Sequence, residues 1–226
     1  MNKDLIIDAG KTGVEIALLE DKRLVELHQG NSESTHLVGD IYLGQVKKLL
    51  PGLNAAFIDV GSKKDGFLHY LDLGLYYKAL EKFTKICMSG GGDSMDFAKL
   101  KEPKLEKSGK IVETLKQGQV ILVQVSKEAI STKGPRLCTE ISFAGRYLVL
   151  VPFSEKVSVS QKIKSAEERN RLRKLIKSIK PDNFGIIIRT IAEGKSVAEL
   201  DADLKDLLSK WESIKKKLPK ALPPTK

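Results

Sequence analysis

The sequence predicts an α+β protein in which a small β-barrel is followed by a part that alternates strands and helices. Two observations carry this prediction. Five short strand patterns, separated by turn signals, lie between residues 41 and 143. From residue 147 onward, strand patterns alternate with amphipathic helical patterns. The barrel and the alternating part therefore form separate structural regions.

Before the barrel, residues 5–27 predict a hairpin of three strands. The apolar runs 5–9, 14–19 and 23–27 are short, and Gly10, Lys11 and Gly13 supply a turn between the first two. The polar segment 30–36 is predicted to be a linker.

The barrel is predicted to be of the OB type, because five short strands with turns between them suit a small Greek-key barrel. Its expected strands are 41–50, 55–60, 66–69, 119–125 and 136–143. The long connection between the third and fourth strands carries a helical pattern at 75–83, a triglycine at 90–92 and a lysine-rich stretch to Lys110. We expect a flexible insertion near residues 84–112.

The alternating part contains the predicted strands 147–152 and 184–189 and two helices. Each helix begins at a serine with a glutamate three residues later, Ser165 with Glu168 and Ser196 with Glu199. This spacing is the signature of a capping box. The proline-containing end, residues 218–226, is predicted to be an unstructured tail or linker.

Charge and composition narrow the class of partner. The 226 residues contain 39 Lys and Arg against 29 Asp and Glu, a net charge of +10, which favours an anionic partner. No apolar run reaches the roughly 18 residues that a membrane span needs. Cys87 and Cys138 form no CxxC pair, so a disulfide framework and a four-cysteine zinc site are excluded. We expect a cytoplasmic protein without a cofactor of its own.

The most informative segment runs from Phe184 to Ser196. A β-branched run ends in Arg189 and Thr190, and a short loop with Gly194 leads to the helix start at Ser196. A guanidinium, a hydroxyl and helix N-terminal amides close together would bind a phosphate. The alternative is a structural role, in which Arg189 pairs with a carboxylate. A P-loop is excluded because Arg189 stands where that motif requires glycine.

Two further groups of residues suit single-stranded nucleic acid. Phe57 and Phe67 lie on neighbouring predicted strands, where aromatic rings can stack on bases. The alternative is that they fill the barrel core. Lys127, Lys133 and Arg136 belong to a basic loop between two strands and could hold phosphates, although a solvated loop has the same composition.

These residues, in this order, resemble the N-terminal half of the ribonuclease E/G family of bacterial endoribonucleases. The resemblance covers roughly residues 3–217. Its motifs are Asp40–Gly44, Ala55–Gly61, Gly66–Leu68, Ser142–Gly145 with Tyr147–Leu150, Ile188–Thr190 through Gly194–Ser196, and Trp211–Lys216.

The resemblance implies four regions and their roles. Residues 1–37 would be the first piece of a ribonuclease-H-like subdomain, 38–140 an OB-fold RNA-binding domain, 141–217 an α/β 5′-sensor subdomain, and 218–226 a tail. The implied partner is single-stranded RNA with a 5′-monophosphate. The implied contacts are Arg189 and Thr190 to that phosphate, the Val149 backbone to the terminal base, and Phe57, Phe67, Lys133 and Lys127 to the strand.

The same resemblance implies Mg²⁺-dependent hydrolysis of a phosphodiester in the full-length parent, which forms an oligomer. The family's metal-binding aspartates, zinc-sharing cysteines and one sensor arginine lie beyond the matched region. We therefore expect this chain to bind RNA as a monomer, with neither a catalytic residue nor a metal site. Two alternatives stay open: a stand-alone RNA-binding protein, and a protein–protein scaffold in which Arg189 is structural.

Overall fold

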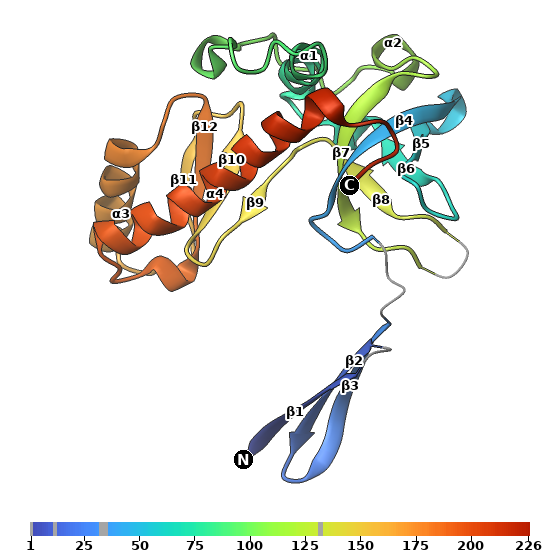
Figure 1. Ribbon diagram of the computed structural model, residues 1–226. Coiled ribbons are helices and arrows are strands. Elements are labelled where there is room, and N and C mark those ends of the chain that lie inside the picture. The colour runs from blue at the N-terminus through green and yellow to red at the C-terminus, as the bar shows by residue number, and fades with distance from the viewer. Residues whose placement is uncertain (1, 11–12, 32–35, 131–132) are drawn as a thin grey trace. The chain divides into compact units, whose positions relative to one another are not determined.

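The computed structural model describes residues 2–10, 13–31, 36–130 and 133–226. The chain divides into two compact units, Met1–Leu37 and Val38–Lys226 (Figure 1). Each unit has its own sheet structure, and the second contains both the barrel and the alternating part.

The first unit is an antiparallel sheet in the order β1-β2-β3. Its strands are β1 (Lys3–Gly10), β2 (Gly13–Glu20) and β3 (Arg23–Asn31), as the three apolar runs predicted. Asp21 and Lys22 both have positive φ, which is the geometry of a tight two-residue hairpin turn. Residues 30 and 31 belong to β3 and not to the predicted linker, and residues 11–12 and 32–35 lie outside the described part.

The second unit begins with a closed five-stranded barrel in the order β4-β5-β6-β8-β7. The strands are β4 (Ile41–Leu50), β5 (Ala55–Asp59), β6 (Gly66–His69), β7 (Val120–Lys127) and β8 (Arg136–Cys138). The turns η1 (Pro51–Leu53) and η2 (Tyr70–Leu73) follow β4 and β6. The predicted strands are therefore present, but the fifth ends at Cys138, five residues earlier than expected.

Alternation along the strands fills the barrel with side chains. Ile58 and Leu68 are fully buried, and Leu137 joins them from β8. A Cβ at Gly66 would lie 2.4 Å from Leu137 Cδ1, so glycine is required where these side chains meet. The parallel pairing of β6 with β8 then closes the barrel.

The alternating part forms a four-stranded sheet in the order β11-β12-β10-β9. Its strands are β9 (Phe143–Ala144), β10 (Leu148–Pro152), β11 (Val157–Val159) and β12 (Phe184–Ile188). Strand β11, which the sequence did not indicate, pairs parallel to β12. Helices α3 (Ala166–Ile179) and α4 (Val197–Lys217) pack against the sheet (Figure 1). The sheet and the helices share one buried cluster.

The expected flexible insertion is packed instead. Helix α1 (Tyr77–Met88) runs five residues beyond the predicted helix, and the turns η3 (Phe97–Lys99) and α2 (Ile111–Thr114) follow. Leu100 and Ile111 are buried. The side-chain Nδ2 of Asn183 donates to two backbone carbonyl oxygens, that of Phe97 at 2.7 Å and that of Leu100 at 3.1 Å. Apolar residues spaced among the lysines therefore anchor this segment to the body of the protein.

The C-terminal end is also packed, contrary to the predicted tail. Leu218, in the turn η5 (Leu218–Lys220), is 3% exposed. Leu43 and Thr225 exchange backbone hydrogen bonds of 2.9 and 3.1 Å, and Lys226 Nζ lies 2.7 Å from Asp40 Oδ2. These contacts attach the end of the chain to the outside of strand β4.

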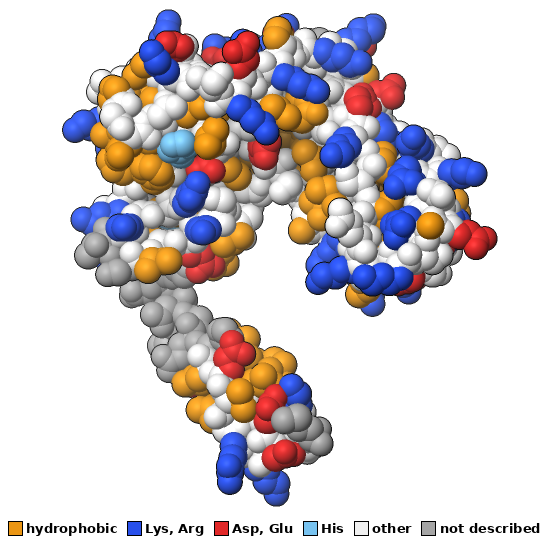
Figure 2. Space-filling model, turned by 180° about the vertical axis from the view of Figure 1, so that it is seen from behind, with side chains coloured by type: hydrophobic (Ala, Val, Ile, Leu, Met, Phe, Trp, Pro, Cys, Tyr) orange, Lys and Arg blue, Asp and Glu red, His pale blue; other side chains and the backbone are white. Residues whose placement is uncertain are grey.

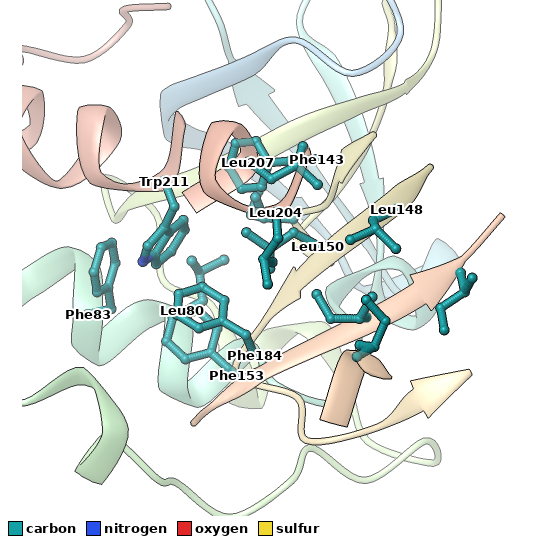
Figure 3. Packing of buried hydrophobic residues seen from close by; sticks show 14 of the residues in the cluster. Leu80, Phe83, Phe143, Leu148, Leu150, Phe153, Phe184, Leu204, Leu207 and Trp211 are labelled. Atoms are coloured by element: carbon teal, nitrogen blue, oxygen red, sulfur yellow. The ribbon is translucent and has the colours of Figure 1, made fainter. Parts of the chain in front are cut away.

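An aromatic cluster around Trp211 joins these elements (Figure 3). The indole of Trp211 on α4 stacks on the Phe83 ring of α1, with ring centroids 4.5 Å apart. Four more rings surround the indole at 5.6–6.4 Å, in largely edge-on arrangements: Phe97, Phe143, Phe153 and Phe184. The insertion, the sheet and the last helix therefore share a single aromatic core.

Replacement of Trp211 by alanine should lower the free energy of unfolding by about 3–5 kcal/mol, because a buried cavity replaces the indole. Urea denaturation followed by circular dichroism measures this value. Trp211→Phe, which keeps an aromatic ring, should cost less. A loss below about 1 kcal/mol for Trp211→Ala would contradict the central place of this ring.

Candidate nucleic-acid interface

Arg189 lies where strand β12 ends. The neighbouring β9–β10 turn accepts hydrogen bonds from both its backbone N–H and its guanidinium. Its backbone N–H donates to Tyr147 O at 2.9 Å, and its guanidinium Nη1 donates to Gly145 O at 2.5 Å. The residue is exposed, and no carboxylate within the described part lies in salt-bridge distance of it. The geometry therefore does not support the alternative in which Arg189 forms a structural ion pair.

Thr190 follows at once and opens the turn η4 (Thr190–Ala192). Its hydroxyl is exposed and lies 2.9 Å from the hydroxyl of Ser160. Either oxygen of this pair can donate, so Thr190 keeps hydrogen-bonding capacity for a ligand. A guanidinium and a hydroxyl therefore stand side by side at the end of the sheet, as the sequence suggested.

The three amides that lead into helix α4 are bonded within the chain, so they do not contribute to the expected phosphate pocket. Ser196 and Glu199 form the full capping box, in which Ser196 N–H donates to Glu199 Oε2 at 3.0 Å. Lys195 N–H donates to Ala192 O, and Gly194 N–H donates to Glu168 Oε1 at 2.9 Å. The three amides that precede the helix are therefore already bonded within the chain.

Glu168 fixes this loop from helix α3. Ser165 caps the helix by accepting from Glu168 N–H, but the Glu168 carboxylate does not return to Ser165 as a capping box would require. It accepts instead from Arg171 Nε at 2.6 Å and from Gly194 N–H. The Arg171 guanidinium, and then the Gly194 N–H, lower the pKa of Glu168 from its ordinary 4.5 to about 2.

Two further cations, which the sequence analysis did not select, surround the neighbouring Tyr147 ring. Arg146 Cζ lies 5.3 Å and Lys195 Nζ 5.4 Å from its centroid. Lys195 is also paired with Glu199 at 3.0 Å. With Arg189, three cationic side chains therefore lie around the β9–β10 turn. In the sequence, Arg146 and Lys195 stand out only as neighbours of Gly145 and Gly194, and this signal is too weak to identify them.

Asp203 on α4 holds the β9–β10 turn in place. Its carboxylate accepts three backbone N–H groups, from Arg146 at 3.0 Å, Tyr147 at 2.8 Å and Leu148 at 2.9 Å. A Cβ at Gly145 would lie 2.6 Å from Asp203 Oδ1, so the turn and the carboxylate fit only with glycine there. This long-range contact fixes the carbonyl that Arg189 binds.

Val149 lies in the middle of the sheet, where it pairs with Ile187 of β12 and Ala144 of β9. Its half-buried side chain faces away from the helices and lines a hollow of about 280 Å³. Alternation places Ile187 and Arg189 on the same face of the sheet. The structure therefore brings Val149 onto the side of the sheet from which Arg189 projects.

On the barrel, Phe57 and Phe67 face each other across strands β5 and β6. Their ring centroids are 6.2 Å apart with an interplanar angle of 69°, and both side chains are half-buried. Their neighbours Ile58 and Leu68 fill the barrel and are fully buried. The phenylalanines therefore belong to the outer face, which leaves part of each ring open to solvent.

Lys127 and Lys133 flank the same face. Lys127, at the end of β7, is opposite Arg136 of β8, which in turn is opposite Phe67. Pro135 O accepts the Phe67 N–H at 2.8 Å, which holds the loop carrying Lys133 beside β6. Arg136 itself is bonded to Asp72 through two nitrogens, at 3.0 and 3.1 Å. Arg136 is therefore an exposed cation with a partner, whereas Lys127 and Lys133 are exposed and have no ion pair among the described residues. Residues 131–132 of the loop lie outside the described part.

Comparison with known proteins places this arrangement in a family. The model of the ribonuclease E/G family matches residues 142–226. Ribonuclease G of Escherichia coli K12 is 35% identical over 214 residues, which is 95% of this chain. The chain belongs to the ribonuclease E/G family.

Other relatives give the same assignment. Ribonuclease E of Nostoc is 41% identical over 180 residues, which is 79% of this chain, and ribonuclease G of Haemophilus influenzae is 36% identical over 93% of it. The chain spans 40% of the Escherichia coli protein, 39% of the Haemophilus protein and 22% of the Nostoc protein. It therefore corresponds to less than half of each of these ribonucleases.

Two features are absent from the described residues. No group of three or more His, Cys, Asp and Glu side chains in that part of the chain is placed to hold a metal ion. No helix there is both long and apolar enough to cross a membrane.

Replacement of Glu168 by glutamine should reduce stability only where the carboxylate is ionised. Because folding lowers the pKa of Glu168, its contribution is present above about pH 4.5 and is lost as the pH falls towards about 2. Urea unfolding from pH 7 to pH 2 measures the difference between the two proteins. That difference should shrink through this window, whereas Glu167→Gln on the same helix turn should show no such trend. A gap for Glu168→Gln that is constant with pH would contradict the account.

Proposed function

We propose that this chain is the RNA-binding and 5′-monophosphate-sensing portion of a ribonuclease E/G-type endoribonuclease, which acts on single-stranded RNA in cytoplasmic RNA processing and decay. The observation that carries the proposal is the exposed pair Arg189 and Thr190 at the end of strand β12, with no carboxylate competing for the guanidinium among the described residues. Membership of the family supports it.

The chemistry of Arg189 suits a terminal phosphate better than a hydroxyl. A guanidinium donates two parallel hydrogen bonds to phosphate oxygens, and a doubly charged monophosphate gains more from this than a neutral end does. Thr190 supplies a hydroxyl beside it, and Arg146 and Lys195 add positive charge nearby. In this proposal Val149, one strand away, contacts the terminal base through its backbone.

The barrel would act as an OB-type RNA-binding domain, formed by residues 38–140, and hold the strand downstream of the 5′ end. Phe57 and Phe67 would stack on bases, and Lys133 and Lys127 would bind the backbone. Support comes from the half-exposed rings on the neighbouring strands β5 and β6, and from Lys127 at the end of β7 and Lys133 in the loop that follows it.

The remaining regions take their roles from the family. Residues 141–217 would be the 5′-sensor subdomain, and residues 1–37 would be the first piece of a ribonuclease-H-like subdomain. The sheet of the first unit exposes apolar side chains such as Leu5 and Ile7, at 62% and 59%, which is consistent with a sheet that has further partners. The parent would assemble as an oligomer, whereas these residues alone would be monomeric.

The parent reaction would be Mg²⁺-dependent hydrolysis of a phosphodiester. The described residues offer no group of three or more His, Cys, Asp and Glu that fits such an ion, so no catalytic step is assigned to them. Their part is recognition, through charge and stacking.

Arg189→Ala should abolish any preference for a 5′-monophosphate. Fluorescence anisotropy with a short labelled RNA that carries a 5′-monophosphate or a 5′-hydroxyl measures both affinities. The native chain should prefer the monophosphate, and Arg189→Ala should weaken that RNA by about 10- to 150-fold, the range for a charge-assisted hydrogen bond. Arg173→Ala removes the same charge from helix α3, where the guanidinium bonds Asn170, and should retain the preference.

Equal, salt-sensitive binding of both RNAs by the native chain would overturn 5′ sensing and leave a general RNA-binding protein. Absence of RNA binding at low salt would overturn RNA recognition altogether and favour a protein–protein scaffold with a structural Arg189.

Phe57→Ala and Phe67→Ala should each weaken single-stranded RNA by about 1–3 kcal/mol, the contribution of one stacked base. The same anisotropy titration measures this with the 5′-hydroxyl RNA, which isolates the barrel from Arg189. Leucine at these positions keeps apolar volume without a flat ring, so it should be nearly as damaging as alanine. An unchanged RNA affinity in the leucine variants would show that the two rings only pack against neighbouring side chains and do not stack on bases.

A further inference from the structure

The exposed face of the sheet continues into a hollow that the proposed contacts do not use. Val149 and Val151 of β10 and Ile187 of β12 form one wall, and residues 139–142 at the barrel exit form another. Ile187 is 44% exposed although it lies in the centre of the sheet. The recess between the barrel and the sheet is visible from behind, with hydrophobic side chains along it (Figure 2).

The hollow begins beside the proposed phosphate site. Val149 is paired with Ile187, and Arg189 follows two residues later on the same face. From Tyr147, which bonds the Arg189 N–H, to Val151 the strand advances about 13 Å at about 3.3 Å per residue. At about 3.4 Å between stacked bases, and more when they are splayed, this distance corresponds to two to four nucleotides.

Tyr76 joins this hollow to a second one. The half-buried Tyr76, just before helix α1, lines the first hollow of about 280 Å³ and also the second, of about 230 Å³. The second hollow is also lined by Lys101 and Lys104 of the insertion. Lys104 Nζ lies 5.9 Å from the centroid of the Tyr76 ring. Phe153 also lines both hollows, so the two are neighbours, and together they are called the trough.

The charges along the trough favour an anionic chain. Glu155 is paired with Lys180 at 2.7 Å, and Glu102 is paired with Lys82 at 2.5 Å. Glu140 in the first hollow is the remaining carboxylate of its lining. Lys101 and Lys104 are exposed and have no ion pair among the described residues. The Lys101 charge also acts on Glu155, so Lys104 is the cation most available to a ligand. An apolar wall, an aromatic ring and available lysines together match bases with their phosphates.

We propose that this trough binds the second and third nucleotides of a 5′-monophosphorylated RNA, with a base on Tyr76 and a phosphate on Lys104. The proposal rests on the proposed function, because Arg189 and Thr190 set where the 5′ end lies. It gives the insertion, residues 75–115, a role in holding the RNA between the sensor and the barrel. The trough would favour ends that are single-stranded over at least three nucleotides, since paired bases cannot enter it.

The test compares a 5′-monophosphorylated mononucleotide with the corresponding trinucleotide, by displacement of a fluorescent RNA. The native chain should bind the trinucleotide more tightly. Tyr76→Leu, which keeps apolar volume, and Lys104→Ala should each weaken the trinucleotide by about fivefold or more and leave the mononucleotide unchanged. Lys107→Ala, an exposed lysine of the same segment that lines neither of these hollows, is the matched control and should behave as native.

A second readout locates the bases. In an RNA hexamer with a 5′-monophosphate, 2-aminopurine at position 2 or 3 should be quenched on binding through Tyr76, and this quenching should be lost in Tyr76→Leu. Native trinucleotide affinity in both variants, or no gain from mononucleotide to trinucleotide, overturns the trough. Tyr76-dependent quenching without a preference for the monophosphate would overturn 5′ sensing and leave the trough as a base-binding site. A preference for the 5′-monophosphate that depends on Arg189, together with no effect of Tyr76→Leu, would overturn only the proposal for the trough.

Discussion

Stacking of the Trp211 indole on the Phe83 ring joins the last helix of the chain to the helix of the insertion. Phe153 and Phe184 carry the same cluster into the sheet, and Phe97 carries it into the segment after helix α1. Because protein interiors are close-packed, these contacts determine how the insertion, the sheet and helix α4 lie against one another. The end of the sheet that carries Arg189 and the trough beside it both depend on that arrangement.

Helix α4, once fixed by Trp211, positions the site through a second contact. Asp203 lies two turns earlier on that helix and accepts three N–H groups of the β9–β10 turn. The turn in turn presents Gly145 O to the Arg189 guanidinium. One guanidinium hydrogen bond therefore holds Arg189 in place while its charge stays unpaired within the described residues, which prepares it for an anion from outside.

Local patterns predicted local structure well. The five barrel strands follow from apolar runs and turn residues, and the capping box at Ser196 follows from a spacing of three residues. Contacts between residues far apart in sequence could not be read in this way. Phe97 and Thr225 looked like parts of loose segments, yet each packs on residues from another region. The same limit applies at the site, where the Glu168 carboxylate reaches from helix α3 to the Gly194 N–H in the loop beside Arg189. The roles of Arg189 and Phe57 were suggested by residue type and position, the family resemblance made them specific, and they remain predictions.

The most direct test of the account is an NMR titration of the isotopically labelled chain with a dinucleotide that ends in either a 5′-monophosphate or a 5′-hydroxyl. The account predicts that the monophosphate shifts the amide signals of residues 145–149 and 187–190, and that the hydroxyl form at the same concentration leaves them nearly unchanged. Equal shifts for the two ends, or shifts confined to the barrel strands, would contradict a phosphate site at the end of strand β12.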